Sequence, residues 1–307
     1  MAELTKEQVE AALKQIDDPY IGKNLVASNT VKGIDIDGGK VSVTIKLGYP
    51  AKGIVNDLAK DVEAKLLDAG AESVDANVGW VIEAHTVQKS LKPLENIKNV
   101  IAIASGKGGV GKSTTAVNFA LALSMEGAIV GMLDADIYGP SQPRMLGVSG
   151  QPKSNDGKSL EPMEAHGLQA MSMGFLIDEE TPMIWRGPMV TQALEQLLND
   201  TQWRGLDYLV VDLPPGTGDV QLTLAQKIPV SGAIIVTTPQ DIALLDARKG
   251  LKMFEKVEVP VLGVVENMSI HICSECKHEE PIFGEGGGKR MADESGVELL
   301  GALPLDI

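Results

Sequence analysis

The sequence predicts an α/β protein of two domains, a small α/β domain over residues 1–90 and a larger parallel-sheet domain over residues 99–307. Short continuous apolar runs separated by helical stretches fill the larger part, which is typical of a parallel sheet covered on both faces. The first 90 residues instead show alternating apolar positions and amphipathic helical repeats. A polar segment, residues 91–98, contains Pro93 and separates the two patterns, so we assign it as the linker.

The elements of the small domain follow from its apolar periodicity. A capping-box pattern at Thr5 begins a helix. Alternation over residues 34–47, broken by a Gly-Gly turn, predicts a β-hairpin. Apolar residues at every fourth position over residues 54–66 predict a second helix, and alternation over residues 74–82 predicts a third strand. This part of the chain has no catalytic pair or metal-ligand cluster, so its pattern supports only a compact module.

The strands of the larger domain are predicted from continuous apolar runs. In open parallel sheets, ligands bind beyond the carboxyl ends of the strands. We therefore expect the functional residues of this domain to follow these strands. The predicted strands are Val100–Ala104, Ala128–Leu133, Tyr208–Val211, Ala233–Val236 and Val261–Val265.

Composition excludes several classes of function. A net charge of −15 and a pI near 4.7 oppose binding to nucleic acid or to an anionic membrane surface, since both need a basic face. The chain has no run of about 18 apolar residues that could span a bilayer. Its polar N-terminus lacks the apolar core of a secretory signal, which predicts a cytoplasmic protein. Two cysteines are too few for a disulfide scaffold.

The first strand of the larger domain runs into a glycine-rich segment that fits the phosphate-loop pattern G-x-x-x-x-G-K-[ST]. Glycines let backbone N–H groups converge on phosphate oxygens. Lys112 is spaced to reach the β- and γ-phosphates, and the Ser113 hydroxyl to bind Mg²⁺. We therefore predict an ATP and Mg²⁺ site. It is formed by Gly106, Lys107, Gly108, Gly109, Val110, Gly111, Lys112, Ser113 and Thr114.

Lys107, directly after the first glycine, is not required by an ordinary phosphate loop. The segment 106–113 resembles the deviant loop of the partitioning, cell-division-positioning, nitrogenase-iron-protein and arsenic-pump ATPases. The resemblance implies that Lys107 reaches across a dimer interface to the partner's phosphates and acts with Lys112 as a catalytic residue. The alternative, from the residues alone, is a solvated loop lysine.

Acidic and amide residues follow other predicted strands. Asp134 and Asp136 follow the strand Ala128–Leu133 and are separated by one residue. The resemblance selects Asp136 as the catalytic residue that positions the attacking water. Asp212 ends another strand and is suited to the magnesium shell. The resemblance also implies a mobile switch at residues 213–219 and an adenine contact by Asn267. Taken singly, such residues are usually helix caps or turns.

Cys273 and Cys276 form a C-x-x-C pair, which can hold one metal or one edge of a cluster, whereas a complete site needs about four ligands. Three interpretations compete. His271 and His278 could complete a zinc site, the pair could be a redox dithiol, or a two-fold dimer could join two pairs. We favour the third, with a [4Fe–4S] cluster, because Lys107 already implies a dimer.

Much of the chain from residue 96 onward resembles the Mrp/ApbC family of iron–sulfur cluster carrier ATPases, and residues 1–90 resemble the MIP18-like domain of iron–sulfur assembly factors. The resemblance implies a homodimer that hydrolyses ATP, receives a [4Fe–4S] cluster from an assembly scaffold and transfers it to apo-proteins. The alternatives are a positioning or partition ATPase without a cluster, and an iron-protein-like reductase. The matching stretches are Ser105–Thr115, Leu133–Ser141, Trp185–Met189, Asp212–Asp219, Thr237–Asp241, Val265–Ser269 and Cys273–Cys276.

The chain departs from the family pattern at three places. The Gly48-Tyr49-Pro50 turn lacks a cysteine that many members have there, which argues against a metal role for the small domain. Lys277 stands where many members have glycine, which predicts a changed turn beside the cysteines. The family usually continues beyond the last strand, so the resemblance implies a further C-terminal helix after residue 307.

Overall fold

The structure is a computed structural model that describes residues 4–85, 88, 91–176 and 187–305. The chain divides into two compact units. One contains Met1–Glu83 with Met125–Ala128, and the other contains Ala84–Ser124 with Ile129–Ile307. The sequence analysis placed its first boundary at residue 90.

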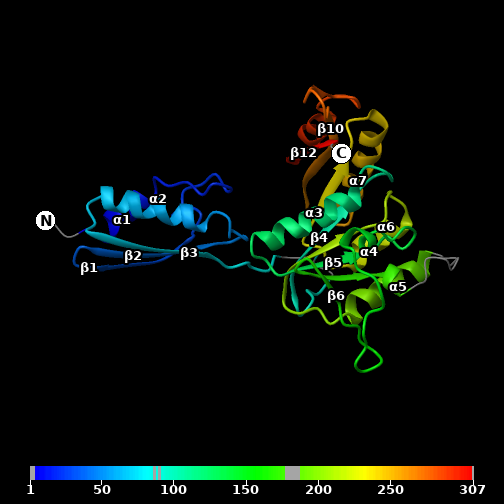
Figure 1. The fold of residues 1–307 in the computed structure, drawn as a ribbon, viewed down its shortest axis with the longest axis horizontal. Coiled ribbons are helices and arrows are strands. Elements are labelled where there is room, and N and C mark those ends of the chain that lie inside the picture. The colour runs from blue at the N-terminus through cyan, green and yellow to red at the C-terminus, as the bar shows by residue number, and fades with distance from the viewer. Residues whose placement is uncertain (1–3, 86–87, 89–90, 177–186, 306–307) are drawn as a thin grey trace. The chain divides into compact units, whose positions relative to one another are not determined.

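The first unit is a three-stranded sheet with two helices on one face (Figure 1). Strands β1 and β2 form the predicted antiparallel hairpin, and β3 pairs with β2 in parallel. A parallel pair needs a crossover connection, which α2 supplies. The elements are α1 (Lys6–Leu13), β1 (Val31–Asp37), β2 (Lys40–Leu47), α2 (Val55–Asp68) and β3 (Ser73–Trp80).

The core of this unit lies between β2 and the helices. The alternating residues Val41, Val43, Ile45 and Leu47 are all buried, as their period of two predicts. The predicted capping box also forms, because the Gln8 main-chain N–H donates to the Thr5 hydroxyl while the Gln8 side chain accepts from the Thr5 main chain.

The second unit contains a nine-stranded sheet in the order β11-β10-β9-β4-β8-β5-β7-β6, with β12 beside β10, over the residues that the structure describes (Figure 1). Every strand pair is parallel except β6–β7 and β10–β11. The predicted α/β class with a parallel sheet is therefore confirmed. Its strands are β4 (Ile97–Ala104), β5 (Val130–Asp134), β6 (Met163–Ala165), β7 (Leu168–Ser172), β8 (Leu206–Asp212), β9 (Gly232–Thr237), β10 (Val261–Ile272), β11 (Glu279–Glu280) and β12 (Leu299–Leu305).

Helices connect these strands, and α5 to α8 pack side by side in chain order. The connecting helices are α3 (Lys112–Met125), α4 (Gln142–Leu146), the 3-10 turn η1 (Met173–Phe175), α5 (Gly187–Asp200), α6 (Asp219–Lys227), α7 (Asp241–Lys256) and α8 (Gly287–Ser295). Every residue of β5 and β9 is buried, which explains why these strands read as continuous apolar runs in the sequence.

Strand β4 begins at Ile97, so it includes the last two residues of the predicted linker, 91–98. The reason is that Ile97 is buried and pairs with Leu206 of β8, an apolar position that the polar composition of the segment obscured.

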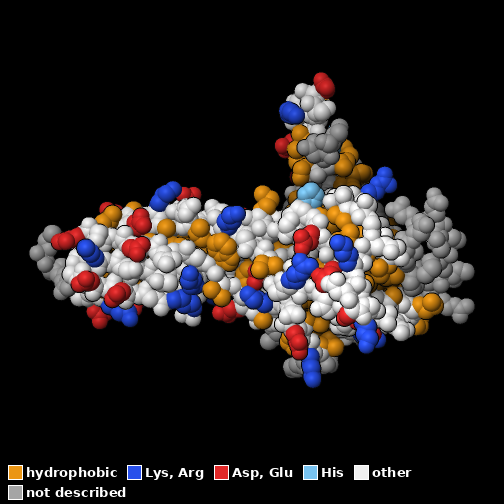
Figure 2. All heavy atoms as spheres, turned by 60° about the horizontal axis from the view of Figure 1, so that its bottom comes forward, with side chains coloured by type: hydrophobic (Ala, Val, Ile, Leu, Met, Phe, Trp, Pro, Cys, Tyr) orange, Lys and Arg blue, Asp and Glu red, His pale blue; other side chains and the backbone are white. Residues whose placement is uncertain are grey.

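Among the described residues, the structure has no helix with both the length and the apolar character needed to cross a bilayer. On the face drawn in Figure 2, the described Lys and Arg side chains lie interspersed with Asp and Glu and form no continuous basic area.

Candidate functional site

The glycine-rich loop lies between the carboxyl end of β4 and the start of α3, at the sheet edge where ligands of parallel sheets bind. Gly109 and Gly111 have φ values of +81° and +80°, a left-handed conformation that side chains rarely adopt. The Ser105 hydroxyl donates to the Lys107 carbonyl at 2.9 Å, and the Ser105 carbonyl accepts from the Gly216 N–H at 2.8 Å. The loop is thus built as a main-chain cradle joined to the predicted switch segment.

Gly106 is required for a different reason, the close approach of another helix. A Cβ placed on Gly106 would lie 2.1 Å from the carbonyl carbon of Asp246 in α7, closer than any packing allows. At Gly108, by contrast, the nearest atom to such a Cβ is 4.0 Å away, in the Pro215 ring. The first glycine of the motif therefore lets the loop pack directly on the main chain of α7.

We expect Gly106→Ala to destabilise the protein by about 1–3 kcal/mol, because helix main chain cannot yield as a flexible side chain would. Gly108→Ala is the matched control, and its expected effect is within about 0.5 kcal/mol. Denaturant unfolding of both variants measures the difference. Equal stabilities would contradict the close packing of the loop on α7.

Lys112 lies buried at the centre of the site. Its ammonium group forms an ion pair with Asp212 at the end of β8 and lies 3.8 Å from the nearer carboxylate oxygen of Asp136. It also contacts the Ser113 hydroxyl at 3.3 Å. The structure thus brings together four residues that the sequence analysis assigned to the nucleotide site. They come from the carboxyl end of β8 and from the segments that follow β4 and β5.

Gln142, at the start of α4, completes this cluster and was missed by the sequence analysis. Its amide Nε2 donates to Asp212 at 2.8 Å and to the main-chain carbonyl of Ser113 at 3.0 Å. Both oxygens of the fully buried Asp212 carboxylate are therefore satisfied, one by Lys112 and one by Gln142. The only signal in the sequence was a polar residue eight positions after Asp134.

The two aspartates after β5 have different surroundings. Asp134 accepts hydrogen bonds from the N–H groups of Asp136, Ser141 and Gln142 at 3.0–3.1 Å, so it shapes the loop that follows. Burial, and next the negative charge of Asp212, raise the pKa of Asp134 to about 7. Burial also raises the pKa of Asp136, an effect that the Lys112 charge opposes. Asp136 is thus the carboxylate that faces the lysine.

The remaining loop lysine, Lys107, is partly exposed. Within the part of the chain that the structure describes, its ammonium group has no ion pair and no hydrogen bond, whereas that of Lys112 has both.

Asn267 follows the part of β10 that pairs with β9. Its amide Nδ2 donates to the Val110 carbonyl of the loop at 2.9 Å. The sequence analysis assigned Asn267 to adenine and did not foresee this contact. The amide Oδ1 remains able to accept a hydrogen bond.

Cys273 and Cys276 lie in a turn between β10 and β11. The Cys273 N–H donates to the His278 carbonyl at 2.9 Å, and the Lys277 N–H donates to the Cys273 carbonyl at 2.9 Å. The main-chain N–H groups of Cys276 and then Glu275 lower the pKa of the Cys273 thiol, which favours the thiolate that binds metals. Lys277 has φ +59°, a conformation better suited to glycine.

The histidines beside this turn do not complete a metal site. Among the described residues, no three His, Cys, Asp or Glu side chains come together in a group that could hold a metal ion. Both His271 and His278 are described, so the single-chain zinc arrangement is not assembled. Each chain offers two thiols, Cys273 partly exposed and Cys276 exposed.

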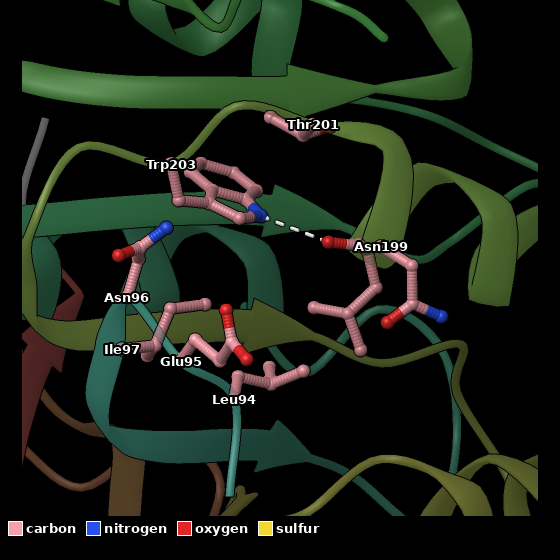
Figure 3. A pocket seen from close by; sticks show the side chains of 8 residues that line it. Leu94, Glu95, Asn96, Ile97, Asn199, Thr201 and Trp203 are labelled. Carbon is pink, nitrogen blue, oxygen red and sulfur yellow. Dashed lines mark hydrogen bonds between the residues drawn. The ribbon is translucent and has the colours of Figure 1, made fainter. Parts of the chain in front are cut away.

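A cavity of ≈280 Å³ lies at the opposite edge of the sheet, beside the amino ends of β4 and β8 (Figure 3). Leu94 to Ile97 and Asn199 line it, and the Trp203 indole N–H is already bound to the Leu198 carbonyl. The phosphate loop follows the other end of β4, so this cavity is separate from the site described above.

Comparison with known families agrees with this geometry. The family described as "NUBPL iron-transfer P-loop NTPase" matches residues 96–307, and the family described as "Iron-sulfur cluster assembly protein" matches residues 6–80. The chain belongs to the iron-transfer P-loop NTPase family. The resemblance inferred from the motifs of both domains is therefore confirmed.

Individual members of the family cover most of the chain. The iron-sulfur cluster carrier protein of Haemophilus influenzae is 51% identical over 304 residues, which are 98% of this chain and 82% of that protein. The mouse iron-sulfur cluster transfer protein NUBPL is 54% identical over 218 residues, 70% of this chain and 68% of that protein.

A solved structure has a similar fold. The nucleotide-binding protein of Archaeoglobus fulgidus, in complex with ADP, is 38% identical with a TM-score of 0.62. The match covers 69% of this chain and 84% of that one. The stretch Trp185–Met189, which contributed to the resemblance, is described only in part, because Trp185 and Arg186 lie outside the described residues.

Proposed function

We propose that two copies of this chain form a cytoplasmic ATPase that holds one [4Fe–4S] cluster between them. The dimer takes the cluster from an assembly scaffold and delivers it to apo-proteins. The observation that carries the proposal is the C-x-x-C turn, where each chain supplies two thiols while a complete cluster site needs about four. Two turns related by a two-fold axis provide the four.

The loop fits ATP, because it lies at the start of a helix and because Gly109 and Gly111 take up the left-handed conformation that turns main-chain N–H groups toward phosphate oxygens. Lys112 would hold the β- and γ-phosphates, and Ser113 with Asp212 would hold Mg²⁺. Bound Mg²⁺ supplies charge neutralisation to the reacting phosphates. To reach a phosphate, Lys112 would break its ion pair with Asp212. In the occupied site Lys112 would then contact the nucleotide, and Asp212 would be free to hold Mg²⁺.

The surface around the loop supports a dimer. Large apolar side chains are exposed on the segments that follow the carboxyl ends of β5 and β9, the edge of the sheet at which the loop lies. Lys107 emerges from the same edge without a described partner of its own. In the proposed dimer it contacts the nucleotide of the other copy. The exposed side chains are Tyr138, Met145, Ile242 and Leu245.

Asp136 is the residue proposed to orient the attacking water, and Asp136→Ala tests that role. We expect the variant to bind ATP but to hydrolyse it about a hundredfold or more slowly, because a positioned general base contributes about that much. A titration with a fluorescent ATP analogue measures binding, and phosphate release measures turnover. Hydrolysis at the normal rate would remove Asp136 from the mechanism.

Two rival functions differ in measurable ways. A positioning or partition ATPase would attach to DNA or membrane in an ATP-dependent manner, which the net charge of −15 opposes. An iron-protein-like reductase would cycle electrons and keep its cluster. Cluster transfer to an apo-acceptor, measured against electron transfer, separates the carrier from the reductase.

The proposal is tested by counting iron and sulfide on anaerobically reconstituted protein and measuring its mass in solution. We expect about four irons and four sulfides per two chains, in a dimer. A monomer that carries a full [4Fe–4S] cluster would contradict the shared site. A zinc content in place of iron would contradict the cluster itself.

A further inference from the structure

We infer that Asn267 is a positioning residue that couples the phosphate loop to the cysteine turn. Its amide donates to the Val110 carbonyl at 2.9 Å, across 157 residues of sequence. Six residues further along the chain is Cys273. The inference rests on the proposed function, since it requires nucleotide and cluster to bind the same chain.

On the loop side, the amide of Asn267 is packed against the main chain. A Cβ on Gly111 would lie only 2.1 Å from Asn267 Nδ2, so the amide occupies the space that a side chain there would need. Gly111 has φ +80°, and Val110 is 2% exposed. A shift of the main chain at these two residues must therefore move the Asn267 amide or break its hydrogen bond.

On the strand side, Asn267 marks the point where β10 leaves the central sheet. Pairing of β10 with β9 ends at Glu266, opposite Thr237. The buried Glu266 carboxylate accepts from the Gly288 N–H at the start of α8, which fixes this end of the strand. Residues 267–280, which we name the cysteine arm, continue beyond that anchor (the orange segment of Figure 1).

The cysteine arm has few attachments and a bend at its base. It pairs with β12 at Asn267 and His271, and the Ser269 hydroxyl donates to the Leu303 carbonyl, while β11 pairs back on His271 and Ile272 within the arm itself. Met268 has φ +56°, a left-handed conformation that non-glycine residues seldom adopt. The register with β12 also shifts between Asn267 and His271. The direction of the arm is thus set at the residues next to the loop contact.

These contacts form one continuous path from Val110 through Asn267 and the bend at Met268 to Cys273. A bound nucleotide affects the cysteine turn through this path only if the nucleotide favours one position of the cysteine arm over another. Such coupling is reciprocal, so the factor by which the cluster changes nucleotide affinity equals the factor by which the nucleotide changes cluster affinity. This coupling is measured as the ratio of the nucleotide dissociation constants of the cluster-free and the cluster-loaded protein.

The test compares this ratio in the natural protein, in Asn267→Ala and in Ser269→Ala, with a non-hydrolysable ATP analogue as the probe. Ser269 is the matched control, because it lies on the same arm but its hydroxyl donates to the Leu303 carbonyl of β12. We expect the ratio of dissociation constants to differ from one by about fivefold or more in the natural protein and in Ser269→Ala. In Asn267→Ala we expect a ratio near one. A weakened adenine contact cancels in the ratio, since it affects both dissociation constants.

The outcomes separate this inference from the function on which it rests. If the natural protein takes up no cluster, the proposed function fails. If it takes up a cluster but its ratio is one, there is no coupling and the inference about Asn267 fails. If the ratio departs from one and Asn267→Ala retains it, the carrier function stands and the role of Asn267 is overturned. Visible absorption of the bound cluster checks equal loading of all three proteins.

Discussion

Replacing Cys273 and Cys276 together by serine is expected to abolish cluster binding and to leave ATP binding within about twofold of that of the cluster-free natural protein. Serine oxygens are poor ligands for iron in such clusters, and the chain contains no other cysteine. The turn itself should survive, because its hydrogen bonds are made by main-chain groups of Cys273, Lys277 and His278. Visible absorption with iron and sulfide analysis measures the loss.

Ser274→Ala is the matched control for the cysteine variant. Ser274 is exposed in the same turn and lies between the two thiols in the sequence. We expect this variant to take up a normal cluster. A serine double variant that still carries four irons per dimer would show that the cluster site is elsewhere.

Replacing Lys112 by alanine is expected to have the second large effect, on both stability and activity. The variant leaves the Asp212 carboxylate buried without its cationic partner, which typically costs about 3–5 kcal/mol. The loss of a charged contact to phosphate should weaken ATP binding by about ten- to a hundredfold. Hydrolysis should fall below detection. Denaturant unfolding, nucleotide titration and phosphate release measure the three quantities.

The double variant Lys112→Ala with Asp212→Asn separates these two effects. It removes the unpaired charge, so we expect it to recover most of the lost stability while ATP hydrolysis stays absent. Recovery of hydrolysis together with stability would mean that Lys112 has only a structural role. Failure to regain stability would mean that the buried Asp212 charge is not what destabilises the single variant.

Much of the fold was predictable because its signals are local. The β2 strand was evident from alternation alone, since every second residue faces the core. The central strands were evident from continuous apolar runs, since parallel strands are covered on both faces. The short strands β6 and β7 were not predicted. A three-residue strand such as β6, Met163–Ala165, shows too few periods to be distinguished from a loop.

The candidate site was predictable in composition but not in contacts. The loop from Gly106 to Thr114 was recognisable because its residues are consecutive and each meets a local requirement of phosphate binding. Gln142 was not recognisable, because its importance comes from an amide placed beside Asp212, 70 residues away. Likewise, neighbouring residues do not reveal that Asp134 shapes its own loop while Asp136 faces Lys112.

The sequence by itself determined the family, the α/β class, the phosphate loop and the pair of thiols, because each is written in residues that are adjacent or regularly spaced. Only the tertiary structure decided the pairing of Lys112 with Asp212, 100 residues apart, and the contact of Asn267 with Val110. These contacts depend on the order in which β8, β4, β9 and β10 lie in the sheet. Hydrophobic periodicity specifies which face of a strand is buried but not which strand lies next to it.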